Sequence, residues 1–472
     1  MGYLAEVGYI AAVCLFSHAL HKRAGVSSSV TRKLTHILIG FVFIIQYHFF
    51  REDPLGLLLV PAIVTVSLFL VARFRLIRSM VNPENPYGIF YYALAILLSN
   101  AIAILYPPYH AAAGAAILSL SLGDGAAALL SGLFPRRHRL LGEKTAEGSL
   151  LCFLFSLLGM WLLGLVFPAI ALPLSLLPLL AVLATLLELF AGRFDNPAIV
   201  FGVGLVAALA AGLSETLLLR LSVGALVGAA VVLLSVGGRM LTLPAAMAAY
   251  AFLLIILAFG GYAAAGYILL LFAASGALSA LGRRRRNRHA DGVRGLRQVI
   301  ANGAVGTLSI LLFGILGEEA LLVAYFAAIA EFLADTAASD IGTLFPRDPI
   351  DICRLRRVPR GRSGGVTLVG SAAAAGACLL ALGLSLLAGL TLRGAAIAAG
   401  AALLGVFFDS FTGSLLQAKY RCRVCGDYTE KPHHCGEAAE KTGGIRLLDN
   451  SNVNLLSTLF SAAAAALLML VL

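Results

Sequence analysis

Apolar runs of helix length follow one another along almost the whole chain. They are about 17–25 residues long and lack the period-2 alternation of a membrane barrel strand. With 60% hydrophobic and 12% charged residues among 472, the chain lies outside the range of a soluble globular domain. In hydrocarbon, a helix satisfies its own backbone polar groups and an open strand cannot. We therefore predict an all-α, polytopic integral membrane protein in a lipid bilayer.

About sixteen membrane spans are expected. Their centres lie near Ala12, Ile44, Val64, Leu97, Ala115, Leu157, Leu179, Val206, Ala229, Phe252, Leu271, Ile310, Ala328, Leu380, Ala402 and Ala464. With this count, the basic loops that carry the net charge of +11 all fall on one side. The positive-inside rule makes this side cytoplasmic and both termini external. We expect no nucleic-acid partner.

The two halves of the chain have a similar order of features. We expect a membrane domain at residues 1–213, a short connection at 214–221 and a second membrane domain at 222–472, which carries an insert at 418–450. Each half has a span that ends in an aspartate, then a glycine-bearing loop and two more spans. A parallel internal repeat would explain this order, and so would the general likeness of apolar helices.

Asp124 lies among small residues at the end of an apolar run. A carboxylate there is costly and is rarely kept without a cation or a polar substrate to meet it. A nucleoside triphosphate needs a carboxylate for Mg²⁺, a cation for its phosphates and glycine for close backbone approach. The following segment supplies these groups, although its lysine alone would more often extend to the membrane interface. The candidate residues are Asp124, Lys144, Thr145, Glu147, Gly148, Asp195 and Asn196.

These motifs resemble those of the CTP-using polyprenol and phytol kinases, dolichol kinase among them. The resemblance covers most of residues 30–210 and rests on Arg32-Lys-x-x-His36, Ser121-Leu-Gly-Asp124-Gly, Gly132, Arg136 to Arg139, Lys144-Thr-x-Glu-Gly148-Ser149 and Asp195-Asn196. It implies that Asp124 holds Mg²⁺, that Lys144 and Thr145 hold CTP phosphates, and that Asp195 completes the site. His36 would lie near the acceptor hydroxyl or be an interfacial histidine. These kinases often have two acidic residues before the asparagine, where this chain has one.

A second acidic group lies at Glu331, Asp335 and Asp340. Glu331, Asp335 and Ser339 are four residues apart, so a helix stacks them on one face, and we expect Asp340 beside them. Two carboxylates one turn apart suit a divalent cation with its phosphate load. The later glycine- and arginine-bearing loop is a candidate phosphate cradle. Further polar candidates, for which interhelical hydrogen bonding is the alternative, are Asn302, Asp409, Asn450 and Asn454.

This half resembles the phytyl-phosphate kinase family over nearly all of residues 222–472. The matching segments are Gln298-Val-Ile-Ala-Asn-Gly303, Ala334-Asp-Thr-x-Ala-Ser339, Gly361-x-Ser-Gly-Gly-Val366, Asp409-Ser-x-x-Gly413 and Asn450-x-x-Val-Asn454. The resemblance implies phosphoryl transfer to an isoprenyl phosphate. Relatives often have a glutamate at the position of Asp340.

The insert contains Cys422-x₂-Cys425 and, ten residues later, Cys435 preceded by two histidines. This spacing supplies four soft or borderline ligands, as tetrahedral zinc requires. We predict a structural Zn²⁺ held by Cys422, Cys425, Cys435 and His434, with His433 as the alternate fourth ligand.

Together the halves predict a bifunctional isoprenoid salvage kinase. It would phosphorylate phytol, geranylgeraniol or farnesol to the monophosphate and then the diphosphate, with CTP and Mg²⁺. The alternatives are a cytidylyltransferase that makes a CDP-lipid and a secondary transporter. We assign catalysis to Asp124, Lys144, Glu147, Glu331, Asp335 and Asp409; nucleotide contacts to Thr145, Gly148, Asp195, Asn196, Arg362, Gly364, Gly365, Asn450 and Asn454; substrate contacts to His36 and Asn302; and Mg²⁺ to Asp124, Asp335 and Asp340.

Overall fold

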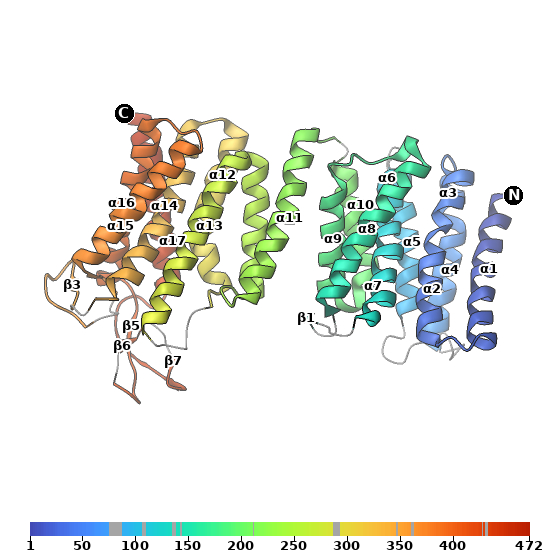
Figure 1. Ribbon diagram of the computed structural model, residues 1–472, viewed down its shortest axis with the longest axis horizontal. Coiled ribbons are helices and arrows are strands. Elements are labelled where there is room, and N and C mark those ends of the chain that lie inside the picture. Colours follow the sequence, from blue (N-terminus) through green and yellow to red (C-terminus); the bar gives the residue numbers. More distant parts are fainter. Residues whose placement is uncertain are drawn as a thin grey trace. The chain divides into compact units, whose positions relative to one another are not determined.

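The computed structural model is built from apolar helices and divides into two compact units, Met1–Leu226 and Val227–Leu472 (Figure 1). The residues that it describes are 1–74, 87–105, 110–134, 138–141, 144–210, 212–286, 293–345, 348–359, 363–426, 428–429 and 433–472. Among them, twelve helices are long and apolar enough to cross a membrane, and three shorter apolar helices accompany them. The predicted all-α, multi-pass membrane fold is confirmed.

Every expected span centre falls within a helix. In unit 1 the helices are α1 (Gly2–Arg23), α2 (Ser28–Gly40), α3 (Val42–Phe50), α4 (Pro54–Phe74), α5 (Gly88–Leu105), α6 (His110–Leu118), α7 (Gly125–Leu130), α8 (Ala146–Val166), α9 (Leu177–Phe190) and α10 (Asp195–Ala210). α11 (Glu215–Gly237) contains the boundary between the units. Residues 215–221, expected to be part of a connection, are therefore the first turns of a helix.

Unit 2 contains α12 (Leu243–Arg286), α13 (Leu296–Leu316), α14 (Glu319–Gly342), α15 (Leu368–Leu387), α16 (Leu392–Leu415) and α17 (Asn450–Val471). α12 is two spans joined at Gly261, where the backbone leaves the helical region (φ 71°). A straight helix of this length would extend about 66 Å at 1.5 Å per residue. Yet a Cβ built on Gly276 would lie 2.5 Å from Met240 Cε, so the chain reverses at Gly261. This turn separates the two spans that the sequence predicted at Phe252 and Leu271.

One buried helix organises each unit. In unit 2 it is α14, which contacts α12, α13, α15, α16 and α17. In unit 1 it is the span His110–Leu133, formed by α6, a π-helical segment Ser119–Asp124 and α7, and it contacts α2, α5, α8, α9 and α10. Each of these two spans is 72% buried, against 11–44% for the other ten spans. Each central span carries one of the two aspartates that the sequence singled out, but it continues beyond the aspartate, from Asp124 to Leu133 and from Asp335 to Gly342, instead of ending there as expected.

A short hairpin follows each central helix. In unit 1, β1 (Arg139–Leu141) pairs with β2 (Lys144–Thr145), and in unit 2, β3 (Ile350–Asp351) pairs with β4 (Gly365–Val366). A threonine then caps the next helix: Thr145 Oγ1 accepts from Gly148 N at 3.2 Å, and Thr367 Oγ1 accepts from Gly370 N at 3.0 Å. This common order supports the interpretation of an internal repeat.

The insert of unit 2 lies at the same end of its helices as the β3 hairpin (Figure 1). Its strands are β5 (Lys419–Arg421), β6 (Tyr428–Thr429), β7 (His433–His434), β8 (Glu437–Ala438) and β9 (Glu440–Gly443). β5 pairs with both β6 and β9, and β7 pairs with β8, all antiparallel.

Small residues let the helices of unit 2 approach α14 closely. At Gly405 of α16, an added Cβ would lie 1.9 Å from Ser461 Oγ and 2.8 Å from Glu331 Cγ. Ser461 is fully buried, and its hydroxyl donates to Ala401 O at 3.1 Å, so it has little freedom to move aside. Gly405 is therefore needed for the contact of α16 with α14 and α17.

Gly405→Ala should destabilise the purified protein by about 1–3 kcal/mol through overpacking. Gly400→Ala on the same helix is the matched control, because a Cβ there meets nothing within 4 Å. Thermal unfolding in detergent should show a lower midpoint for Gly405→Ala and an unchanged or higher one for Gly400→Ala. Equal midpoints for the two variants would contradict the packing argument.

Candidate active sites

A charged cluster in unit 1 gathers around Lys144 of β2. Its ammonium forms an ion pair with Glu188 of α9 and lies 3.4 Å from Asp195 Oδ2 of α10. The Glu188 side chain is only 6% exposed. Burial by itself lowers the pKa of Lys144, but the carboxylates of Glu188, Asp124 and Asp195 outweigh it and hold this pKa above its usual value. Lys144 therefore stays protonated among three carboxylates.

Asp124 joins this cluster from the π-helical segment of the central span. Such segments often occur at functional sites, because they turn side chains out of the regular helical order. Asp195, Lys144 and Glu188 all act on the Asp124 carboxylate electrostatically. The structure thus brings Asp124, Lys144 and Asp195 together, as the sequence predicted.

His36 of α2 faces the same carboxylate. Its Nε2 lies 3.8 Å from Asp124 Oδ2 and is buried without a hydrogen-bond partner among the described residues. The Tyr92 ring packs on the imidazole of His36 at a centroid distance of 3.9 Å. The Tyr92 hydroxyl donates to the backbone carbonyl of His36 at 2.5 Å. These contacts hold the ring in place while leaving one nitrogen turned towards the cluster.

The glycines around Asp124 serve helix packing. A Cβ on Gly123 would lie 2.1 Å from Ser156 Oγ of α8, and one on Gly125 would lie 2.4 Å from Ile37 Cγ1 of α2. Gly40 of α2 makes the reciprocal approach, since a Cβ built on it would lie 1.8 Å from Ser121 Oγ. Glycine therefore brings α2 and α8 against the segment that carries Asp124.

Other residues predicted for the first site have local partners. Thr145 and Gly148 form the cap of α8. The Glu147 carboxylate accepts from the backbone N–H of His138, and its Oε1 lies 2.6 Å from His138 Nδ1. The structure thus directs Glu147 to the segment that leads into the β1–β2 hairpin. Asn196 donates its backbone N–H to Asp195 Oδ1 at 2.9 Å.

Glu188 was missed by the sequence analysis. It is the one acidic residue of α9, whose other residues are apolar except Thr185. A single carboxylate in an apolar span is a signal of a functional site, since its charge needs a partner. The sequence contained that signal, but the partner Lys144 lies 44 residues away.

The second cluster surrounds Glu331 in the middle of unit 2. This side chain is 2% exposed, and its Oε1 accepts from Ser457 Oγ of α17 at 2.8 Å. Asp335, one turn further along α14, and Asp409 of α16 act on it electrostatically. The structure therefore gathers the three predicted catalytic carboxylates of this half from two helices. Carboxylates so placed repel one another, and a divalent cation would stabilise them.

Two predicted asparagines lie beside this cluster as an interhelical contact. Asn454 Nδ2 of α17 donates to Asn302 Oδ1 of α13 at 3.2 Å, and Thr458 Oγ1 donates to Ala301 O at 3.3 Å. Asn450 is the first residue of α17 and is exposed. The α13–α17 contact is the alternative that the sequence analysis kept for these asparagines.

Asp340 lies on a different side of α14 from Asp335. Five residues correspond to a rotation of about 140° at 3.6 residues per turn. Its Oδ2 accepts from Ser279 Oγ of α12 at 2.8 Å, and Arg294 Nη2 donates to the same hydroxyl at 3.1 Å. The structure thus places Asp340 at the α12 contact rather than beside Asp335.

The predicted phosphate loop packs against the end of α16. Gly364 has φ +81°, and a Cβ there would lie 2.5 Å from the Ser414 backbone. Gly365 belongs to β4, and Arg362 lies outside the described residues.

Asp351, also missed by the sequence analysis, anchors this hairpin. Its Oδ1 accepts from Ser414 Oγ at 2.7 Å and from the backbone N–H groups of Cys353 and Arg354. Burial raises the pKa of Asp351, but these hydrogen bonds and Lys419 outweigh it and leave the pKa below its usual value.

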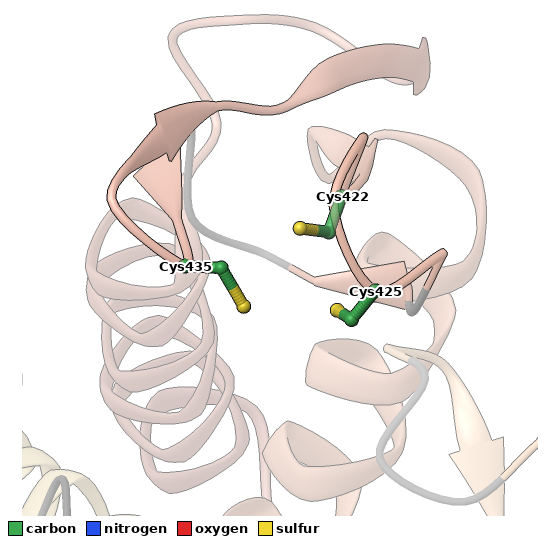
Figure 2. A group of neighbouring side chains, drawn as sticks. All are labelled: Cys422, Cys425 and Cys435. Atoms are coloured by element: carbon green, nitrogen blue, oxygen red, sulfur yellow. The ribbon is translucent and has the colours of Figure 1, made fainter.

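The structure also brings together the three predicted cysteine ligands of the insert (Figure 2). Their sulfur atoms all lie within 4.8 Å of one another. The side chain of the fourth predicted ligand, His434, lies outside the described residues.

The fold and these buried charged clusters define a polytopic integral membrane protein. The family model described as "Integral membrane protein DUF92" matches residues 226–462, which is half of the chain and nearly all of unit 2. The protein belongs to this family of integral membrane proteins. No curated protein and no solved structure matches the chain.

Lys144→Met should destabilise the protein by about 1–3 kcal/mol, because it leaves the buried Glu188 without its cation. The double variant Lys144→Met/Glu188→Met should recover much of this loss, since an apolar pair can replace a buried ion pair. The control is Glu52→Gln. The Glu52 side chain is 87% exposed, so its substitution should change the stability little. The measurement is thermal unfolding in detergent. An unfolding midpoint of the Lys144→Met single variant equal to that of the wild type would contradict the pairing.

The lowered pKa of Asp351 predicts a pH dependence. A carboxylate with a lowered pKa in the folded state stabilises the protein fully at pH values above its unfolded pKa of about 3.9. This stabilisation is lost as the pH falls through the folded pKa. The Asp351→Asn variant should therefore be less stable than the wild type at neutral pH, and its unfolding midpoint should fall less than that of the wild type on acidification. Unfolding midpoints between neutral pH and about pH 3 measure this, and parallel curves for the two proteins would refute the assignment.

Proposed function

We propose that this protein is a bifunctional lipid kinase that phosphorylates an isoprenoid alcohol and then its monophosphate, with CTP as donor and Mg²⁺. One observation carries the proposal: each unit has its own carboxylate cluster at a buried central helix, followed by a hairpin and a threonine-capped helix. Two equivalent centres suit two successive transfers of the same kind. The phytol kinase-like and phytyl-phosphate kinase-like motifs of the two halves support the same order of steps.

The oxygen donors of both clusters fit Mg²⁺, which prefers carboxylate ligands and brings phosphate with it. In unit 1, Asp124 and Asp195 would hold the ion, and Lys144 would bind the phosphates. In unit 2, Glu331, Asp335 and Asp409 would hold it. When bound, Mg²⁺ neutralises charge on the transferring phosphoryl group.

The protein's own contribution is position and charge. In unit 1, His36 Nε2 would be placed to accept the proton of the attacking hydroxyl, because this nitrogen is turned to the cluster and has no hydrogen-bond partner in the part of the chain that the structure describes. The apolar helices around each cluster suit an isoprenoid tail that remains in the bilayer. We further propose that the motif loops face the cytoplasm, where CTP is supplied, and that both termini are external.

The test is transfer of the labelled γ-phosphoryl group of CTP to phytol and, separately, to phytyl monophosphate by the purified protein. Asp124→Asn should lower the first transfer, and Asp335→Asn the second, by at least about 100-fold, because metal-bound charge stabilisation contributes several kcal/mol. Each variant should retain the other transfer. Asp53→Asn, at an exposed aspartate before α4, is the matched control.

Three outcomes would contradict the proposal. Release of pyrophosphate with a CDP-lipid product would identify a cytidylyltransferase. Intact CTP with either acceptor would exclude kinase activity on these lipids and favour transport. Loss of both transfers in each single variant, with folding retained, would refute two separate centres.

A further inference from the structure

The three cysteines of the insert lie on two tight turns that face each other. Cys422 follows β5 directly, and its Sγ accepts from Val424 N at 3.4 Å. The second turn joins β7 to β8 at Cys435. Figure 2 shows the side chains of Cys422, Cys425 and Cys435 directed towards a shared space.

Each turn contains a cysteine followed by a glycine in the left-handed region. Gly426 has φ +76° and Gly436 has φ +81°. Cys435 itself has φ +54°, a conformation that is uncommon for a residue with a Cβ. Such a conformation is kept where the surroundings determine it, and here it directs Cys435 Sγ towards the other two sulfurs.

The distances suit a metal better than a disulfide. In a tetrahedral site with Zn–S bonds of about 2.3 Å, sulfur atoms lie about 3.8 Å apart. The three sulfurs within 4.8 Å would need to close by only about 1 Å. One disulfide, in contrast, would leave the third thiol of the cluster unused. We propose that Cys422, Cys425 and Cys435 bind one Zn²⁺ and that this ion holds the ends of α16 and α17 in register.

The second part of the proposal follows from how the insert is attached. Ile445 N donates to Leu416 O at 2.8 Å, and Ala418 N donates to Leu448 O at 2.9 Å. Gly444, with φ +76°, packs so closely on Gln417 that a Cβ would lie 2.0 Å from its carbonyl oxygen. The segment that leaves α16 and the segment that enters α17 therefore lie side by side.

These two helices carry groups of the second acidic cluster. Asp409 lies six residues before the end of α16 at Leu415, and Ser457 of α17 donates to Glu331. The metal would limit the movement of both helices at the end where these groups lie. This consequence for the transfer reaction rests on the proposed function, whereas metal binding itself does not.

Three thiolates leave one position of a tetrahedral zinc ion for a further ligand. The sequence places His433 and His434 immediately before Cys435. A histidine in either position can complete a Cys₃His site, and single substitutions distinguish them.

The experiment measures zinc in the purified full-length protein by mass spectrometry after growth with zinc. We expect one equivalent per chain, and loss of most of it in Cys422→Ser, Cys425→Ser and Cys435→Ser. Cys14→Ser, an exposed thiol of α1, is the matched control and should keep its metal. One of His433→Ala and His434→Ala should lower the zinc content, and the other should not.

A second measurement does not depend on the folding of any variant. Wild-type protein stripped with a chelator and titrated with Co²⁺ should develop the visible absorption of a tetrahedral cobalt–thiolate site. Zinc-free wild-type protein that gives no such band would overturn the proposal, as would Cys→Ser variants that keep the full zinc content.

The effect on the helices is tested by chelation. Removal of the ion should lower the unfolding midpoint of the wild type and not that of the Cys→Ser variants.

If the proposed kinase activity is present, chelation of zinc with Mg²⁺ in excess should weaken transfer to phytyl monophosphate more than transfer to phytol. An unchanged wild-type midpoint would refute the structural role, and a lowered midpoint without any transferase activity would refute the proposed function alone.

Discussion

Carboxylates enclosed by apolar helices dictate much of this architecture. Glu188 and Glu331 are almost sealed from solvent, and a charge in that position is tolerated only where other polar groups meet it. Lys144 reaches Glu188 from β2, so the hairpin must fold back onto α9 and α10. Ser457 reaches Glu331 from α17, which requires α17 to pack closely on α14. The small residues at these contacts, such as Gly405, are the means by which the helices come close enough.

The two clusters meet this constraint differently. Unit 1 contains its own cation, Lys144, so its carboxylates are partly neutralised by the protein itself. In unit 2, the groups that act on Glu331 are two carboxylates and a hydroxyl. Glu331 thus interacts with two further carboxylates, whereas Glu188 interacts with an ammonium group. This difference gives the two units distinct electrostatic requirements within a similar order of helices.

The sequence was sufficient for the spans, because their length and hydropathy are local properties. It also identified Asp124, Asp195, Glu331, Asp335 and Asp409, since charged residues stand out in apolar runs. It missed Glu188, although that residue has the same signature, and it placed Asp340 beside Asp335.

Helical periodicity could have corrected the position of Asp340, because the five-residue spacing puts it on another side of the helix. The attachment of Asp351 to Ser414 could not have been predicted. It depends on how the hairpin folds onto α16, over 63 residues of chain.

The reversal at Gly261 has a consequence for how unit 2 enters the membrane. The chain turns there without a connecting loop, and the apolar stretch Leu243–Gly282 on both sides of it contains no charged residue. A helical pair of this kind can insert as one apolar unit, because no polar segment has to cross the bilayer with it. Basic residues lie on both flanks of this pair, Arg239 before its first helix and Arg283 onwards at the end of its second. Both flanks therefore favour the same side of the membrane, as a pair of helices that enters and returns to that side as one hairpin requires.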